Sequence, residues 1–144
     1  MIHYYYGFGK GKTSSAVGAG MRAYGAGMSV LFVQFFKDNK SSERSVLPFE
    51  VYPCPESLPF NVCEEYNIKT ADSDVIILDE FADLIPRFLS VDEMKSIFSS
   101  DKEYIITGHN YLNELGDTAD YVTRFEKIKH PYDSGVPARK GIEF

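Results

Sequence analysis

Residues 7–13 read Gly-Phe-Gly-Lys-Gly-Lys-Thr, and this stretch decides the fold. The residues before it, Ile2 to Tyr6, are β-branched and aromatic, which predicts a strand that ends at Gly7. From Thr13 onward the residues are small and compatible with a helix, and Gly25 and Gly27 predict its end. A strand, a glycine-rich turn and a helix in this order predict a loop whose backbone N–H groups and helix N-terminus hold phosphate.

This arrangement indicates a P-loop, in which particular residue types bind the phosphates and the Mg²⁺ ion of a nucleotide. Lys12 neutralises phosphate charge, the hydroxyl of Thr13 is suited to Mg²⁺, and Lys10 offers a second cation. The common P-loop places its first glycine five residues before the second, which is Tyr6 here, so the loop is a shortened form. The candidate nucleotide-binding residues of the loop are Gly7, Phe8, Gly9, Lys10, Gly11, Lys12 and Thr13.

An acidic pair, Asp79-Glu80, follows the apolar run Asp74 to Leu78. P-loop proteins place carboxylates at the end of such a strand, facing Mg²⁺. Ligands of open α/β sheets bind at the carboxyl ends of the strands, so the loop, the acidic pair and Thr107-Gly108 are expected at one edge. The predicted metal ligands are Thr13, Glu80 and Asp79, with either carboxylate holding the ion directly or through water.

The remaining pattern predicts alternating strands and short helices. Ser90-Val-Asp-Glu93 is a capping box that opens a helix through Phe98. The chain as a whole predicts one α/β domain over residues 1–144, with a P-loop NTPase-like (RecA-like), mostly parallel sheet and helices on both faces. Strands are expected at 29–36, 49–52, 74–78, 104–107 and 121–128, a helical stretch at 81–88 interrupted by Pro86, and a short helix at 110–115 stopped by Gly116.

The net charge, the length of the apolar runs and the cysteine count argue against several classes of function. A net charge of −6 and a pI near 5.0 argue against a nucleic-acid partner. The apolar runs are strand-sized, far below the ~20 residues of a membrane span, and no signal peptide is visible. Cys54 and Cys63 have no second pair with which to form a zinc site, so they are interpreted as free thiols. The expectation is a soluble cytoplasmic protein with no membrane partner.

Several segments together resemble the ATP:corrinoid adenosyltransferases. The loop is similar to that family's shortened Gly-x-Gly-Lys-Gly-Lys-Thr, and residues 22–27 and 33–37 match its Arg-Ala-x-Gly-x-Gly and Val-Gln-Phe-x-Lys. The strand ending in Asp79-Glu80 matches its D-x-x-x-L-D-E, and residues 119–123 fit Ala-Asp-Leu-Val-Thr. The tail, 129–144, is the most specific match, and the resemblance covers nearly the whole chain.

The resemblance implies an enzyme that transfers the 5′-deoxyadenosyl group of ATP to Co(I) of a corrinoid and releases triphosphate. It implies roles for Lys12, Lys10 and Glu80 in catalysis, and places Arg22 and Gln34 near the nucleotide or corrinoid. ATP and a corrinoid are the implied substrates, with Mg²⁺, a reductase that supplies Co(I) and a homodimeric assembly.

The chain departs from the family at a few positions. His109 stands where the family has the arginine of Ile-Thr-Gly-Arg, and Arg124 stands in place of a glutamate. The family's Phe-x-Trp segment over the corrinoid has no counterpart, since the chain contains no tryptophan, and Phe60 is the candidate substitute.

Two other functions fit a phosphate-binding loop with Mg²⁺. One is an ATPase or kinase in which Asp79-Glu80 supplies a base and a metal ligand. The other is a module that binds nucleotide or corrinoid without catalysis. The phosphorus product of ATP separates the three, because they yield triphosphate, phosphate with ADP, and no product respectively.

Overall fold

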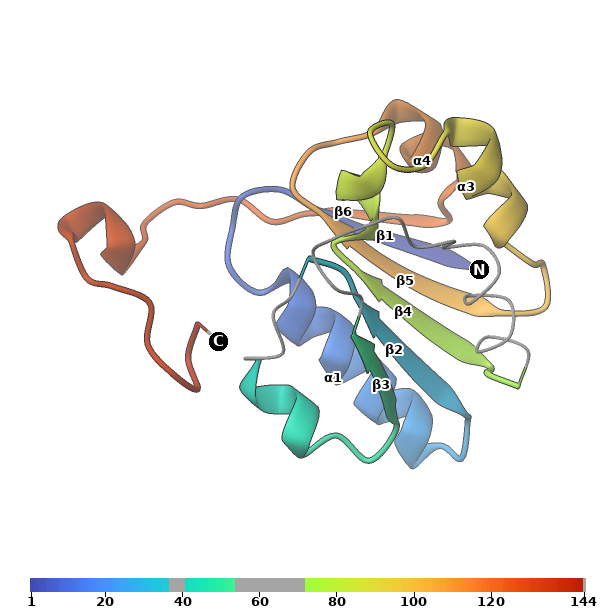
Figure 1. Cartoon of the computed structure of the whole chain (residues 1–144), viewed down its shortest axis with the longest axis horizontal. Coiled ribbons are helices and arrows are strands. Elements are labelled where there is room, and N and C mark those ends of the chain that lie inside the picture. The colour runs from blue at the N-terminus through green and yellow to red at the C-terminus, as the bar shows by residue number, and fades with distance from the viewer. Residues whose placement is uncertain (37–40, 54–71, 144) are drawn as a thin grey trace.

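The fold is built on one parallel sheet, whose strands are labelled β1 to β6 in Figure 1. The computed structural model describes residues 1–36, 41–53 and 72–143. Within these ranges the sheet has six strands in the order β3-β2-β4-β5-β1-β6, and every neighbouring pair is parallel. The strands are β1 (Ile2–Tyr6), β2 (Val30–Gln34), β3 (Glu50–Pro53), β4 (Val75–Asp79), β5 (Glu103–Gly108) and β6 (Tyr121–Arg124). The predicted parallel α/β architecture is confirmed.

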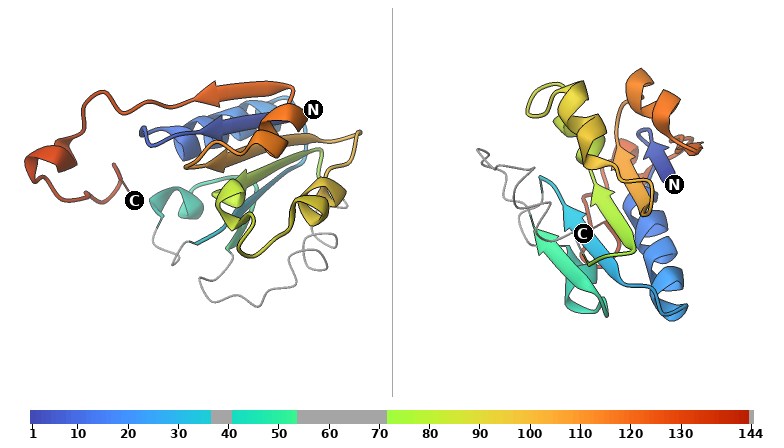
Figure 2. Two further views of the ribbon diagram at one scale, coloured as in Figure 1. Left: turned by 90° about the horizontal axis from the view of Figure 1, so that it is seen from above. Right: turned by 90° about the vertical axis from the view of Figure 1, so that its right-hand side faces the viewer.

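Helices cover both faces of the sheet, as the two views of Figure 2 show. The long helix α1 (Lys12–Gly25) packs on one face against the middle strands. The other face carries the 3₁₀ turn η2 (Phe81–Leu84) and the helices α3 (Val91–Ile97) and α4 (Asn113–Thr118). Two further 3₁₀ turns are η1 (Ser42–Ser45), between β2 and β3, and η3 (Pro131–Ser134), in the tail after β6.

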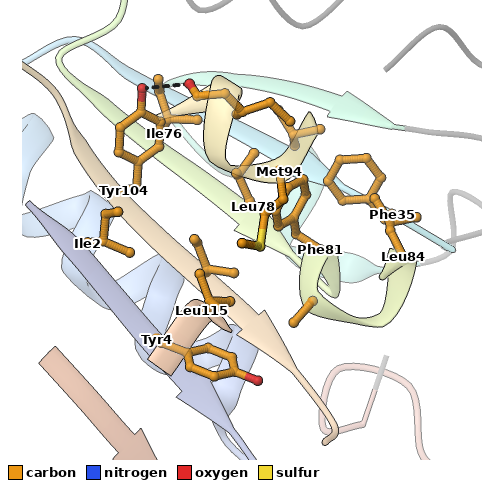
Figure 3. Close-up of a cluster of buried hydrophobic side chains, with 14 of the residues drawn as sticks. Ile2, Tyr4, Phe35, Ile76, Leu78, Phe81, Leu84, Met94, Tyr104 and Leu115 are labelled. Carbon is orange, nitrogen blue, oxygen red and sulfur yellow. Dashed lines mark hydrogen bonds between the residues drawn. The ribbon is translucent and has the colours of Figure 1, made fainter. Parts of the chain in front are cut away.

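The larger apolar core lies between the sheet and the α3/α4 face (Figure 3). Tyr4, Leu78 and Met94 are fully buried there, and Leu115 reaches the same core from α4. The Tyr104 hydroxyl at its rim donates a hydrogen bond of 3.2 Å to the Ile97 carbonyl oxygen. Burial on both faces explains why the central strands are continuous apolar runs. The carboxyl ends of these buried strands carry the candidate site described below.

The predicted capping box is confirmed in full. The Ser90 hydroxyl accepts a hydrogen bond from the Glu93 N–H at 3.2 Å, and the Glu93 carboxylate accepts one from the Ser90 N–H at 2.8 Å. The helix that follows ends at Ile97.

Other predicted elements differ at their ends. Strand β6 stops at Arg124 rather than at 128, because the backbone of Phe125 turns to meet the phosphate loop, where its carbonyl oxygen accepts from the Gly9 N–H. The helix expected at 110–115 instead spans Asn113–Thr118, and Gly116 lies inside it. Glycine is needed at position 116 because the Tyr111 side chain lies where a Cβ of residue 116 would stand. The stretch 81–88 contains only η2, which ends at Leu84, ahead of Pro86.

Candidate nucleotide-binding site

The carboxyl ends of four strands meet at one edge of the sheet. The register pairs Tyr6 with Gly108 and Gln34 with Asp79, so these four residues end neighbouring strands. Strand β5 lies between β1, which leads into the phosphate loop, and β4, which leads into the acidic pair. The structure thus brings the loop, the acidic pair and Thr107 together, as the sequence predicted.

The phosphate loop is held open by backbone contacts that require glycine. Gly7 has φ +115°, and its N–H donates to the carbonyl oxygens of Gly108 and His109 at 3.2 and 3.0 Å. The Gly9 N–H donates to the Phe125 carbonyl oxygen at 2.9 Å, and a Cβ at Gly9 would lie 2.7 Å from the carbonyl carbon of Phe125. A side chain at either position would push the loop away from β6.

Lys12 begins α1 and turns back over the loop. Its Nζ donates to the Gly7 carbonyl oxygen at 2.6 Å and to the Gly9 carbonyl oxygen at 3.2 Å. The first turn of α1 has no acidic residue, so the positive end of the helix dipole is not offset locally. An ammonium and a helix N-terminus on the same loop favour a bound anion.

Asp79 is completely buried and is held by hydroxyl groups. Its Oδ1 accepts from Thr13 Oγ1 at 2.8 Å and from Thr107 Oγ1 at 2.7 Å. The Gln34 Nε2 lies 3.5 Å from the Asp79 Oδ2 and 3.2 Å from the Glu43 Oε1. The carboxylate that meets Thr13 is therefore that of Asp79.

Glu80 is positioned by an uncommon backbone conformation. Its φ of 61° lies in the left-handed region, which costs a residue with a side chain roughly 1–2 kcal/mol. The Glu80 N–H donates to Thr107 Oγ1 at 2.8 Å, which fixes this turn, and Glu80 lines the cavity above the loop. Backbone strain at such a position is typical of a functional site.

The oxygen atoms of Thr13, Asp79 and Glu80 are the kind of donor set that Mg²⁺ prefers. Among the described residues, no lysine, arginine or histidine side chain lies within 4.0 Å of the Asp79 carboxylate, whose charge is thus left for another cation. Gln34 Oε1, beside it, is a buried acceptor with no hydrogen-bond partner in the described part of the chain. A hydrated divalent cation would supply both the charge and a donor, so these residues fit magnesium.

Lysine and histidine side chains line the cavity above the loop, which has a volume of about 280 Å³. Lys10, Lys12, His109 and His130 line it, together with Glu80 and the loop backbone. A second cavity of about 520 Å³ adjoins it and is lined by α1, η1 and the tail. Thr13, Ser14, Ile142 and Glu143 line both cavities.

The C-terminal tail closes one side of this site. After β6 it runs away from the sheet, turns at η3 and comes back toward the phosphate loop (Figure 1). Lys10 Nζ donates to the Ile142 carbonyl oxygen at 2.6 Å and to Glu143 Oε1 at 3.1 Å. Hydrogen bonds from Arg139, aided by Lys10, lower the pKa of Glu143 to about 2. Sequence reasoning assigned no role to His130, Ile142 or Glu143, although the tail was its most specific family match.

His109 is held by Asp83 from η2. The Asp83 carboxylate accepts from the His109 backbone N–H at 3.0 Å and from its Nδ1 at 2.7 Å. This hydrogen bond raises the pKa of His109 above its ordinary value. The exposed ring of Phe8 packs against the imidazole with 5.8 Å between ring centroids.

The remaining predicted site residues are Arg22, Phe60 and Gln34. Arg22 is exposed in the last turn of α1, about 15 Å along the helix from Lys12, and lines neither cavity. Phe60, like Cys54 and Cys63, lies outside the described residues. Gln34 is near the site but buried beneath it, in contact with Asp79.

The fold and the loop define a P-loop protein of the α/β class. The chain matches the model of the family ATP:corrinoid adenosyltransferase BtuR/CobO/CobP over residues 1–54 and 60–144. It belongs to that family and is a transferase. The unmatched residues, 55–59, fall in the Pro-rich segment before Phe60.

Curated relatives carry the same family name. Corrinoid adenosyltransferase CobA of Salmonella typhimurium is 29% identical over 167 aligned positions, which cover 96% of this chain and 82% of that protein. The corrinoid adenosyltransferase of Pseudomonas aeruginosa is 30% identical, over 96% of this chain and 80% of that protein. That of Escherichia coli K12 is 29% identical over the same share of this chain.

No helix in the described ranges is both long and apolar enough to cross a membrane.

Proposed function

We propose that this protein transfers the 5′-deoxyadenosyl group of ATP to Co(I) of a corrinoid and releases inorganic triphosphate. The main observation in support is a phosphate loop that opens into a cavity lined by Lys10, Lys12, His109 and His130. A second cavity adjoins it, because the two share lining residues. The first cavity suits a polyphosphate, and the second leaves room for the group to be transferred. Family membership selects the corrinoid as the acceptor.

The reaction needs positioning and charge stabilisation rather than a general base. Co(I) attacks C5′, the cobalt–carbon bond forms as the C5′–O bond breaks, and the electron pair of that bond leaves with triphosphate. Lys12, the loop N–H groups and the N-terminus of α1 stabilise the charge that develops on the leaving group. Thr13, Asp79 and Glu80 would hold Mg²⁺, which when bound neutralises further phosphate charge.

The second cavity is suited to the adenosyl half of ATP. Val17, Val46 and Ile142 give it apolar walls for the adenine, and Ser42 and Glu43 offer polar groups for the ribose or base. Because Thr13 and Ser14 line both cavities, C5′ would lie near their junction, where the acceptor must approach.

Val46 gives this placement a test, because its side chain is 77% exposed and can be changed without disturbing the core. Val46→Asp is expected to weaken ATP binding by about threefold or more, through a charge beside the base and lost apolar contact, and to leave tripolyphosphate binding unchanged. Titration calorimetry measures both affinities, and Val122→Asp on exposed β6 is the matched control. Equal ATP affinity in all three proteins would place the adenosyl group elsewhere.

The same proposal includes a reductase, because Co(I) is a strong reductant that must be generated near the site of use. It also includes a homodimer, which the family resemblance implies, and a cytoplasmic location, which is the expectation from the sequence. Light scattering on the purified protein measures its mass in solution and tests the dimer.

The experiment for the proposed function is an anaerobic reaction with chemically reduced cobalamin, ATP and Mg²⁺. Conversion of the Co(I) absorption spectrum to that of the adenosylated product is the expected result. ATP binding without any conversion would make the protein a nucleotide-binding relative that has lost the chemistry.

A further inference from the structure

We propose that His109 is a phosphate-binding residue that contacts the triphosphate of ATP as an imidazolium, so that polyphosphate binding draws a proton onto the protein. The proposal rests on the proposed function, since it concerns the leaving group of that reaction. It adds a role for a residue that stands apart from the phosphate loop in the sequence and was given no role by the motif.

The position of His109 makes it available to a ligand. It follows the carboxyl end of β5 and lines the same cavity as Lys12 and the loop, and its side chain is 44% exposed. The ring is held by Asp83 at Nδ1, and the Phe8 ring lies beside it at an interplanar angle of 45°. A fixed ring loses little conformational freedom when it binds phosphate.

The hydrogen bond to Asp83 decides what the other ring nitrogen can do. A carboxylate is an acceptor only, so Nδ1 carries a proton in both charge states of the ring. The neutral imidazole then presents a lone pair at Nε2, which repels phosphate oxygens, and the imidazolium presents an N–H donor. Among the described residues Nε2 has no hydrogen-bond partner. An ionised phosphate oxygen can therefore be bound at Nε2 only by the protonated ring.

The charges around His109 favour that protonated ring once phosphate arrives. Asp83 and, more weakly, Glu80 raise its pKa, while Lys12 lowers it. Three further titratable groups line the same cavity, namely Lys10, His130 and Glu143. His130 is constrained differently, because its Nδ1 accepts from the Tyr132 N–H. A triphosphate adds several negative charges beside His109 and raises its pKa further, which is the source of the proton uptake.

The test is calorimetric titration of inorganic tripolyphosphate into the full-length protein at about pH 8, in buffers of differing ionisation enthalpy, which reports protons taken up on binding. His109→Asn is short enough to keep an N–H for Asp83 and removes Nε2. We expect affinity to fall roughly tenfold, as for the loss of a charge-assisted hydrogen bond, and the wild-type proton uptake to disappear. His109→Arg, a permanent cation, is expected to recover affinity without proton uptake.

His3→Asn is the matched control. His3 is also partly buried and bonded to a carboxylate, that of Glu103 at 2.5 Å, but it lines neither cavity. It is expected to leave both affinity and proton uptake unchanged. If wild type and His109→Asn bind tripolyphosphate with equal affinity and equal proton uptake, the inference is wrong and the proposed function stands. If wild type does not bind tripolyphosphate, the phosphate site and the inference both fail.

Discussion

Lys12→Ala is expected to weaken ATP binding by about a hundredfold and to abolish turnover. The Lys12 ammonium already lies on the loop, bonded to the carbonyl oxygens of Gly7 and Gly9, so it is in place before the phosphates arrive. Without it, the site loses the cation that lies closest to the loop backbone, and the remaining groups offset the charge of a triphosphate less well. Calorimetric titration of ATP into both proteins measures the loss.

Lys95→Ala is the control for Lys12→Ala, because Lys95 is exposed in the last turn of α3 and lines neither cavity. It is expected to bind ATP as wild type does. Circular dichroism checks that both variants keep the fold. Unchanged affinity together with unchanged turnover in Lys12→Ala would show that the loop does not hold the triphosphate.

Asp79→Asn is expected to lower Mg²⁺-dependent turnover by about a hundredfold or more while preserving the fold. Asparagine has the same shape, but a neutral amide is a poor ligand for a hard cation. The Thr13 and Thr107 hydroxyls that now donate to Asp79 would keep one oxygen to bond to. The measurement is the dependence of turnover on Mg²⁺ concentration, with removal of the ion by a chelator as the reference for complete loss.

Glu80→Gln is the companion to Asp79→Asn and decides how the two acids share the metal. Glu80 lines the cavity, but the carboxylate that accepts from Thr13 is that of Asp79, so replacing Glu80 is expected to weaken the Mg²⁺ dependence less than Asp79→Asn does. A larger effect of Glu80→Gln would assign the direct metal contact to Glu80, and no effect of either would remove both from the metal site.

Local pattern was enough to predict the architecture. The strand at 2–6, the loop at 7–13 and the helix after it are contiguous, and each has its own signal in the sequence. The apolar strand before Asp79 could be predicted because both faces of a central parallel strand are buried. The edge strand β6 was harder, because its side chains are exposed and its end is set by a contact of Phe125 with the loop.

The contents of the site could be predicted only in part. Successive strand residues point to opposite faces, but Asp79 and Glu80 lie where β4 ends and the backbone turns, so alternation could not decide which one meets Thr13. Lys10 and Glu143 are 133 residues apart, and exposed charged residues give no pattern that reveals such a pairing. The Asp83–His109 pair is likewise a tertiary contact between two short turns.

The most direct test of the central claim is the phosphorus product of ATP. In an anaerobic reaction with reduced corrinoid and Mg²⁺, ³¹P NMR should show intact triphosphate, formed in equal amount with the adenosylated corrinoid and absent when the corrinoid is omitted. Attack at C5′ releases all three phosphates together and leaves the adenosyl group on the corrinoid, whereas attack at the γ-phosphorus leaves ADP. Phosphate and ADP as the products, formed whether or not the corrinoid is present, would contradict the account and make the protein an ATPase.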